Sequence, residues 1–201
     1  GIGADEFVLI SVGTVCVNHK RMDHVIREVA ALPGARLVVV GQENGETPAI
    51  KALGRELLGE RVIFTKMPNE QLPQAYAAAD AFVLGSRHET FGIVYIEAMA
   101  MGLPVFCTDH PNQQDIVKEA VFVDMTRPGA LTAALRDTPR ERLAELGRRG
   151  REIVREHYDL ARLKRRYVEE YGRIAAAPDS LPAYTLGTRV RANLRDAARR
   201  A

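Results

Sequence analysis

The feature that most constrains the fold is a regular alternation of short apolar runs with segments of helical periodicity. The runs are rich in Val, Ile, Leu and Phe, and their apolar residues are consecutive rather than at every second position. They occupy residues 6–13, 36–41, 61–65, 81–85, 104–108 and 121–124. Strands that are buried on both faces of a parallel sheet have this continuous pattern.

A helical pattern follows each apolar run, at residues 20–32, 47–59, 69–80, 91–101, 112–119 and 128–137. Short connections that repeat strand and helix in turn are typical of right-handed βα units. The sequence therefore predicts one doubly wound α/β domain, with a parallel six-stranded sheet and helices on both of its faces.

The carboxyl-terminal part has a different pattern. Residues 139–158 and 159–177 predict two charged amphipathic helices, and Pro178 and Pro182 then end the helical periodicity. We expect residues 1–177 to form one domain with its carboxyl-terminal helices, and residues 178–201 to form a basic tail. In that tail, residues 185–201 can form a basic amphipathic helix.

Composition excludes several classes of function. The net charge of +2, without a basic run interleaved with aromatic residues, argues against a dedicated nucleic-acid binder. Cys16 and Cys107 are too few and too far apart for a disulfide framework or a zinc site, so we expect reduced core thiols in a cytoplasmic protein. No apolar stretch approaches the roughly 20 residues of a membrane span, and no export signal is recognised.

Candidate functional residues follow the predicted strands. In an open parallel sheet, ligands bind beyond the carboxyl ends of the strands, near the point where the strand order reverses. The residues expected at this edge are Gly13, Thr14, Gly41, Lys66, Met67 and the segments 86–92 and 108–113. Each loop alone is weak evidence, because every βα turn needs glycine or polar residues.

Glu97 is the most unusual of the candidates, because it lies in the middle of an apolar helical segment. Its neighbours at helical spacing are all apolar: Ile93, Val94, Ala100 and Met101. An unpaired carboxylate in such surroundings would cost several kcal/mol. We therefore expect Glu97 to have a structural partner, to reach the helix end or to line a ligand cleft.

The same segment has features that suit a phosphate group. A helix that begins near Phe91 would direct free N–H groups and its positive dipole end toward the cleft, and Gly92 has no side chain to keep a ligand away. Lys20 and Arg21 open the first predicted helix and can add a positive charge beside the cleft. The alternative for these two residues is an ordinary solvated surface.

The motif "HETFGIVYIEAMAMGLPVFCT" (88–108) resembles the signature of glycosyltransferases with the two-Rossmann-domain (GT-B) architecture, family 4 in particular. That signature has two glutamates separated by seven residues and usually includes E-x-F-G, E-A-M-A and G-x-P-V. The segments 7–26 and 61–89 are similar to the phosphate loop and the nucleotide-base loop of the family. The resemblance covers residues 6–175, which correspond to the family's Rossmann-like donor-binding domain.

The resemblance implies a role for each matching residue. Glu97 would accept hydrogen bonds from the ribose hydroxyls of a nucleotide, and Glu89 would contact the hydroxyls of the transferred sugar. The backbone of Phe91, Gly92 and Ile93 would hold the sugar and the phosphates. The base would lie against the loop at Lys66 and Met67.

Two departures from the family pattern affect the phosphate loop. Family members often have an arginine directly after the first glycine, at the position that Thr14 occupies here. Lys20 also comes one residue later than usual. The predicted donor-binding residues are nevertheless taken together as Gly13, Thr14, Lys20, Arg21, Lys66, Met67, Phe91, Gly92, Ile93 and Glu97, with Glu89 at the donor sugar.

The function implied is the donor-binding half of a retaining, hexosyltransferase-type glycosyltransferase that uses a nucleoside diphosphate sugar. The amino-terminal acceptor domain of this architecture is absent from these 201 residues, so we expect the chain alone to be inactive. No cofactor is expected besides the donor substrate. No metal is expected either, because the chain lacks the D-x-D signature by which the other major transferase fold holds a divalent cation. His88 and His110 flank the predicted cleft, and an ordinary role as loop residues is the alternative for both.

Two other functions remain open from the sequence. One is a sugar-nucleotide epimerase or a phosphorylase of the same architecture, and the other is a non-enzymatic nucleotide-binding domain. The expected location is cytoplasmic. The basic tail is expected to dock on the missing domain, and the alternatives are a disordered tail or contact with the inner membrane surface. The sugar, the nucleotide base and the acceptor are not specified by the sequence.

Overall fold

The computed structural model describes residue 3 and residues 6–176, so the predicted tail at 178–201 lies outside the described residues. The chain divides into a first unit that ends at Asp159 and a second unit that begins at Leu160. The first unit contains a parallel six-stranded sheet with helices on both faces, which confirms the predicted fold class. Its strands are β1 (Phe7–Val12), β2 (Ala35–Val40), β3 (Val62–Thr65), β4 (Ala81–Leu84), β5 (Val105–Thr108) and β6 (Val121–Val123).

The strand order is β3-β2-β1-β4-β5-β6, and each neighbouring pair is parallel. The chain builds outward from β1 to β3 in one direction and then returns to place β4 on the other side of β1. The order therefore reverses between β1 and β4, and a crevice opens beyond the carboxyl ends of these two strands. This topology fixes where a ligand site is expected.

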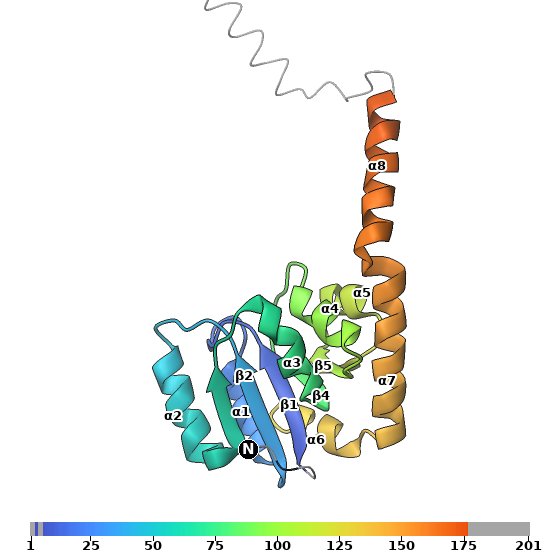
Figure 1. Cartoon of the computed structure of the whole chain (residues 1–201). Helices are drawn as coiled ribbons and strands as arrows, with labels where there is room; N and C mark the ends of the chain where they lie inside the picture. The colour runs from blue at the N-terminus through green and yellow to red at the C-terminus, as the bar shows by residue number, and fades with distance from the viewer. Residues whose placement is uncertain (1–2, 4–5, 177–201) are drawn as a thin grey trace, which may run out of the picture. The chain divides into compact units, whose positions relative to one another are not determined.

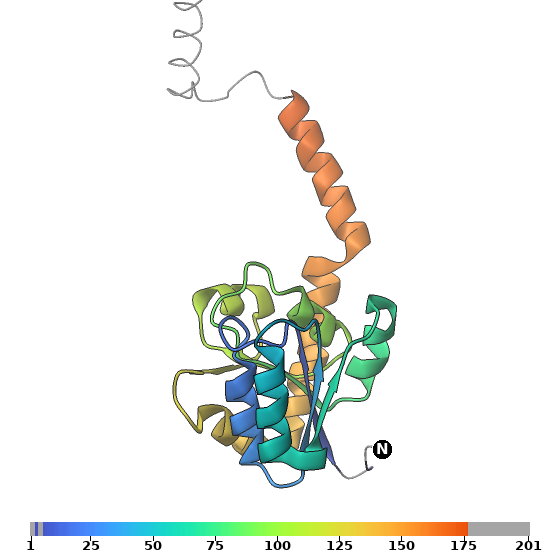
Figure 2. The same ribbon diagram turned by 90° about the vertical axis from the view of Figure 1, so that its left-hand side faces the viewer.

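Helices cover the two faces of the sheet in two sets. The core on one face includes α1 (Met22–Ala30), α2 (Thr47–Leu58) and α6 (Ala130–Asp137). The core on the other face includes α3 (Leu72–Ala77), α4 (Ile93–Ala100) and α5 (Pro111–Val117), together with the end of α7 (Arg140–Ile153). Figure 2 shows α1 and α2 over one face of the sheet, with α3 on the opposite side.

Short helical turns join several of these elements. They are the 3₁₀ turns η1 (Gly59–Arg61) and η2 (Asn69–Gln71) and the π-helical turn η3 (Val154–Tyr158) that extends α7. The predicted helix at 69–80 is therefore divided into η2 and α3, because Pro73 occupies the first turn of α3. The helix predicted at 139–158 likewise changes its winding after Ile153.

Two helices of the site begin later than predicted. The helix expected near Phe91 begins at Ile93, because Gly92 adopts the left-handed conformation with φ of 61°. α1 begins at Met22 rather than at Lys20, and Arg21 before it has φ of 49°. Arg21 and Lys20 are thus part of the loop that leads to α1.

The second unit contains α8 (Leu160–Ala176). A stripe of apolar side chains runs along this helix, and within it the rings of Tyr167 and Tyr171 stack with centroids 6.3 Å apart. None of the helices in the described part of the chain is long and apolar enough to cross a membrane.

Candidate functional site

The loops after β1 and β2 meet at the carboxyl edge of the sheet, next to the switch point between β1 and β4. The Gly13 N–H donates to the Val40 carbonyl at 2.9 Å, and the Gly41 N–H donates to the Thr65 carbonyl at 3.0 Å. A Cβ atom on Gly41 would lie only 1.6 Å from the carbonyl oxygen of Gly13. The two loops can approach this closely because position 41 has no side chain, and their contact forms the floor of the site.

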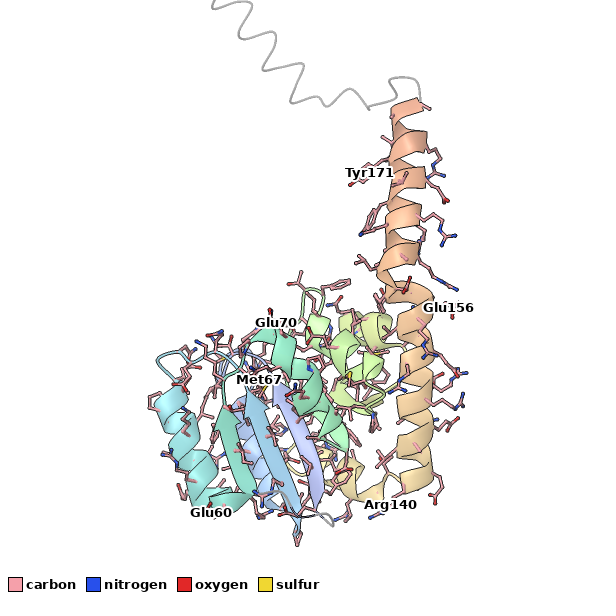
Figure 3. The ribbon with its side chains drawn as sticks, in the orientation of Figure 1. Glu60, Met67, Glu70, Arg140, Glu156 and Tyr171 are labelled. Carbon is pink, nitrogen blue, oxygen red and sulfur yellow. The ribbon has the colours of Figure 1, made fainter. Side chains whose placement is uncertain are left out.

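A pocket of about 290 Å³ opens above this floor, and we call it the Glu97 pocket. Its walls come from the ends of β1, β2 and β3, from the start of α3 and from α4. It is lined by Val12, Gly13, Thr14, Val40, Gly41, Gln42, Lys66, Met67, Asn69, Leu72, Val94 and Glu97. Figure 3 labels Met67 and Glu70 at this edge of the sheet. Five predicted donor-binding residues, far apart in sequence, therefore line one pocket.

Glu97 enters this pocket from α4 and has a partner within the protein. Its Oε2 accepts a hydrogen bond from the Tyr76 hydroxyl of α3 at 2.8 Å. Burial, followed by the charge of Glu97 and this hydrogen bond, raises the pKa of Tyr76, so the hydroxyl stays protonated and continues to donate. Among the described residues no hydrogen bond reaches Oε1 of Glu97, which is therefore available to accept from a ligand.

Lys20 and Glu89 form an ion pair next to this pocket. Nζ of Lys20 lies 2.5 Å from Oε1 of Glu89, and only 14% and 8% of the two side chains are exposed. The Lys20 side chain also packs against Gly13, where an added Cβ would lie 3.3 Å from Cε of Lys20. The cation therefore lies between the loop after β1 and the loop that carries Glu89.

The amino terminus of α4 lies between the two glutamates in sequence. Gly92 is the residue before the helix, and no side chain caps its first N–H groups. These N–H groups and the positive end of the helix dipole favour an anion. Phe91 and Ile93 are 52% and 60% exposed, so the start of this helix is open rather than buried as its apolar sequence indicates.

Arg21 is directed away from the Glu97 pocket. Its Nη1 donates to the carbonyl oxygen of Met125. It lines a second pocket of about 500 Å³, formed with Gly85, Arg87, His88, Thr108, Asp109, His110, Asp124, Met125 and Thr126. His88 and His110 meet there with ring centroids 6.0 Å apart. The two predicted cations therefore lie in different surroundings, and it is Lys20 that pairs with the carboxylate of Glu89.

The two cysteines are core residues, as the sequence predicted. Cys16 and Cys107 are buried and free, and burial raises the pKa of the Cys107 thiol, so it stays protonated. Within the described residues, no group of three His, Cys, Asp or Glu side chains is placed to hold a metal ion.

Two side chains of the site do not follow from the sequence motif. Tyr76 is the partner of Glu97, and the amide of Asn112 contacts the loop that carries Glu89. Tyr76 interrupts an alanine-rich segment, and Asn112 is one of several polar residues that follow β5. These patterns give no indication of which distant residue each side chain will contact.

Comparison with known proteins gives the family context of this site. Residues 1–153 match the family model described as "Glycosyl transferases group 1". The chain is 39% identical over 111 residues to a D-inositol 3-phosphate glycosyltransferase of Mycobacteroides abscessus, and 34% identical over 113 residues to a sulfoquinovosyl transferase of Arabidopsis thaliana. These alignments cover 52% and 56% of the chain.

A solved structure shows the same fold. The sucrose-phosphate synthase from Thermosynechococcus elongatus matches with a TM-score of 0.80 and 28% identity, over 88% of this chain and 47% of that protein. The alignments with the two curated relatives cover 25% and 21% of those proteins, so the chain spans about a quarter of their length.

Proposed function

Because the chain belongs to the glycosyl transferases group 1 family, we propose that it is the donor-binding half of a retaining glycosyltransferase. Its substrate would be a nucleoside diphosphate sugar, from which a hexosyl group is moved to an acceptor. The observation that carries this proposal is the Glu97 pocket, which opens at the switch point of the sheet and has the uncapped α4 terminus beside it.

In this proposal the nucleoside occupies the Glu97 pocket. Ribose hydroxyls donate to Oε1 of Glu97, while Tyr76 holds Oε2 and so fixes the orientation of the carboxylate. The base lies against Lys66 and Met67, which line the same pocket from the end of β3. Recognition of the base by main-chain atoms leaves uridine, guanosine and adenosine donors as candidates.

The diphosphate and the sugar follow toward Glu89. The diphosphate would accept from the N–H groups at the start of α4 and from Lys20. These groups supply the positive charge, so the proposal requires neither a metal ion nor a cofactor besides the donor. Lys20 would then exchange Glu89 for the diphosphate, which frees the Glu89 carboxylate to accept from the sugar hydroxyls.

The acceptor would be held by a second, amino-terminal domain of the same architecture. Transfer requires donor and acceptor to be held together, and such positioning can supply about 7–11 kcal/mol of a barrier. One wall of a cleft does not provide this, so we propose that residues 1–201 alone bind the donor and transfer no sugar. The proposal is consistent with the quarter of the relatives' length that the chain spans.

The location and the tail are also proposals. We place the protein in the cytoplasm and the basic segment 178–201, which lies outside the described residues, against the acceptor-binding domain. Sedimentation with anionic vesicles tests this, because strong binding that depends on residues 185–201 and is lost at high salt would instead assign the tail to a membrane surface.

A thermal-shift series tests the main proposal. Nucleoside diphosphates, nucleotide sugars and mononucleotides are compared at equal concentration, since a ligand at 100 times its dissociation constant adds about 2.7 kcal/mol of stability. We expect stabilisation by at least one nucleoside diphosphate and by its sugar, and a smaller effect of the matching mononucleotide. No stabilisation by any nucleotide would contradict donor binding.

A further inference from the structure

The loop that carries Glu89 is held by the segment that follows β5. Oγ1 of Thr108 donates to the carbonyl oxygen of Ser86 at 2.7 Å, and Nε2 of Gln113 donates to the same oxygen at 3.3 Å. Ser86 and Gln113 are fully buried. The start of the loop is therefore anchored at one point by two side chains from a neighbouring βα unit.

A second anchor lies at Glu89 itself. Nδ2 of Asn112 donates to the main-chain carbonyl oxygen of Glu89. Asn112 is itself fixed in the first turn of α5, where its main-chain N–H donates to Nδ1 of His110 at 3.2 Å. Glu89 is thus held through its backbone by Asn112 and through its carboxylate by Lys20.

The residues around Glu89 are exposed, including Arg87, His88, Thr90 and Phe91. Little packing constrains the backbone in this part of the loop, so a directed hydrogen bond has a large share in fixing it. The main-chain group that Asn112 holds belongs to the same residue whose carboxylate pairs with Lys20. A shift of this backbone would move the carboxylate relative to the diphosphate and the sugar.

We propose that Asn112 is a positioning residue for Glu89: its side-chain amide sets the backbone at position 89 so that the carboxylate can meet the donor sugar once Lys20 engages the diphosphate. This inference rests on the proposed function, since it requires a nucleotide sugar in the site. Asn112 does not contact the ligand in this account and acts only through Glu89.

The Asn112→Ala variant separates positioning from general stability. We expect its affinity for a nucleotide sugar to fall about tenfold, which corresponds to the loss of one good hydrogen bond. Its affinity for the matching nucleoside diphosphate should stay within about twofold of the wild type, because the Glu97 pocket and the α4 terminus are unchanged. Gln114→Ala is the matched control, since Gln114 lies on the same helix and donates to the exposed Asp109.

A double-mutant cycle tests whether Asn112 acts through Glu89. Calorimetry measures the affinities of four proteins: the wild type, Asn112→Ala, Glu89→Gln and the double variant. The ligands are UDP with UDP-glucose, and GDP with GDP-mannose. If Asn112 acts through Glu89, Asn112→Ala causes little further loss of sugar-dependent affinity once residue 89 is glutamine.

The outcomes separate this inference from the proposed function. The positioning role would be overturned if the affinity losses of Asn112→Ala and Glu89→Gln added independently in the double variant. It would also be overturned if Asn112→Ala weakened diphosphate and nucleotide-sugar binding equally. Both results would leave donor binding in place. The positioning role would likewise be overturned if the wild type bound each nucleoside diphosphate as tightly as the corresponding nucleotide sugar. If the wild type binds none of these nucleotides, the proposed function and the positioning role both fail.

Discussion

Lys20 and Glu89, which lie 69 residues apart in sequence, form a largely buried ion pair with 2.5 Å between Nζ and Oε1. Each of the two was predicted from sequence to contact a different part of the donor. In the structure they form an ion pair with each other instead. A diphosphate that engages Lys20 must therefore compete with Glu89, and the ion pair couples phosphate binding to the release of the carboxylate.

Replacement of Glu89 by glutamine removes this competition. We expect Glu89→Gln to bind a nucleoside diphosphate at least as tightly as the wild type, because Lys20 is released and no carboxylate faces the phosphates. The same variant should lose the additional affinity that the sugar provides. Titration calorimetry with a diphosphate and its sugar measures both effects, and a clear loss of diphosphate affinity would contradict the competition.

Replacement of Lys20 by alanine should have the opposite selectivity. Loss of a charge-assisted hydrogen bond of about 1.5–3 kcal/mol would weaken nucleoside diphosphate binding by tenfold or more, and nucleoside binding much less. The variant also leaves the buried Glu89 without its partner, which lowers the free energy of unfolding. The affinities are therefore measured at a temperature where the variant is folded, and equal weakening of both ligands would remove Lys20 from the diphosphate site.

A test of Glu97 needs a substitution that keeps a hydrogen-bond acceptor for the Tyr76 hydroxyl. Glu97→Ala would leave the buried Tyr76 hydroxyl without an acceptor, at a cost of about 1–3 kcal/mol in stability. Glu97→Gln keeps a carbonyl oxygen for Tyr76 and removes the charge that faces the ribose. We expect this variant to lose about tenfold in nucleotide affinity while its unfolding midpoint changes little.

Tyr76→Phe is the matched control for Glu97→Gln. It removes the hydroxyl that holds Oε2, so stability should fall by about 0.5–1.5 kcal/mol, while nucleotide affinity changes only a few-fold. Calorimetry and thermal unfolding of the two variants distinguish the roles. Unchanged affinity in Glu97→Gln would mean that Glu97 serves only as a structural partner of Tyr76.

The sequence predicted the strands well for a physical reason. Strands such as β1, β2 and β4 are buried on both faces, so almost every position is apolar, and this pattern is local. The order of the strands depends on packing between distant segments and was not contained in any one of them. The start of α4 was misplaced because its apolar sequence continues through Phe91, whereas the left-handed backbone of Gly92 delays the helix.

The candidate site was predictable only in part. The motif located the glutamates, and the βα pattern located the loops at the carboxyl edge. The contacts Lys20 to Glu89, Tyr76 to Glu97 and Asn112 to the Glu89 backbone join residues more than 20 positions apart. Such contacts depend on the tertiary arrangement and have no local signature in the sequence.

Glu28 gives a pH-dependent prediction for the stability of the fold. Its buried carboxylate accepts from the N–H of Gly129 at 2.7 Å and from the N–H and hydroxyl of Thr132, both at 2.9 Å, and so caps the start of α6. Burial raises the pKa of Glu28, but the hydrogen bonds from Gly129 and Thr132 outweigh it, and the pKa is lowered from 4.5. Because the folded-state pKa is the lower one, this contribution to stability is present above about pH 4.5 and is lost as the pH falls through the folded-state value.

Glu28→Gln should therefore be destabilised by about 1–3 kcal/mol at pH 7 and by less at an acidic pH at which the wild-type carboxylate has become protonated. Urea unfolding at the two pH values measures the difference. Glu60→Gln is the control, because Glu60 is exposed (Figure 3) and its side chain should contribute less than about 0.5 kcal/mol. A loss in Glu28→Gln that is equal at both pH values would exclude the carboxylate as the cause.

The contact between Gly13 and Gly41 makes a final prediction about the floor of the Glu97 pocket. A Cβ atom at position 41 would lie 1.6 Å from the Gly13 carbonyl oxygen, and that neighbour is backbone that cannot rotate away. Gly41→Ala must therefore separate the loops after β1 and β2 and disturb the bond from the Gly13 N–H to the Val40 carbonyl. We expect a loss of about 1–3 kcal/mol or more in stability and a loss of nucleotide binding at temperatures where the variant is still folded.

Gly45→Ala is the matched control for Gly41→Ala, since a Cβ there meets no atom within 4 Å, and it should keep the stability and the nucleotide affinity of the wild type. Thermal unfolding and diphosphate titration of the two variants measure these effects. Wild-type stability and affinity in Gly41→Ala would show that the loops can separate without loss of stability and do not set the shape of the pocket.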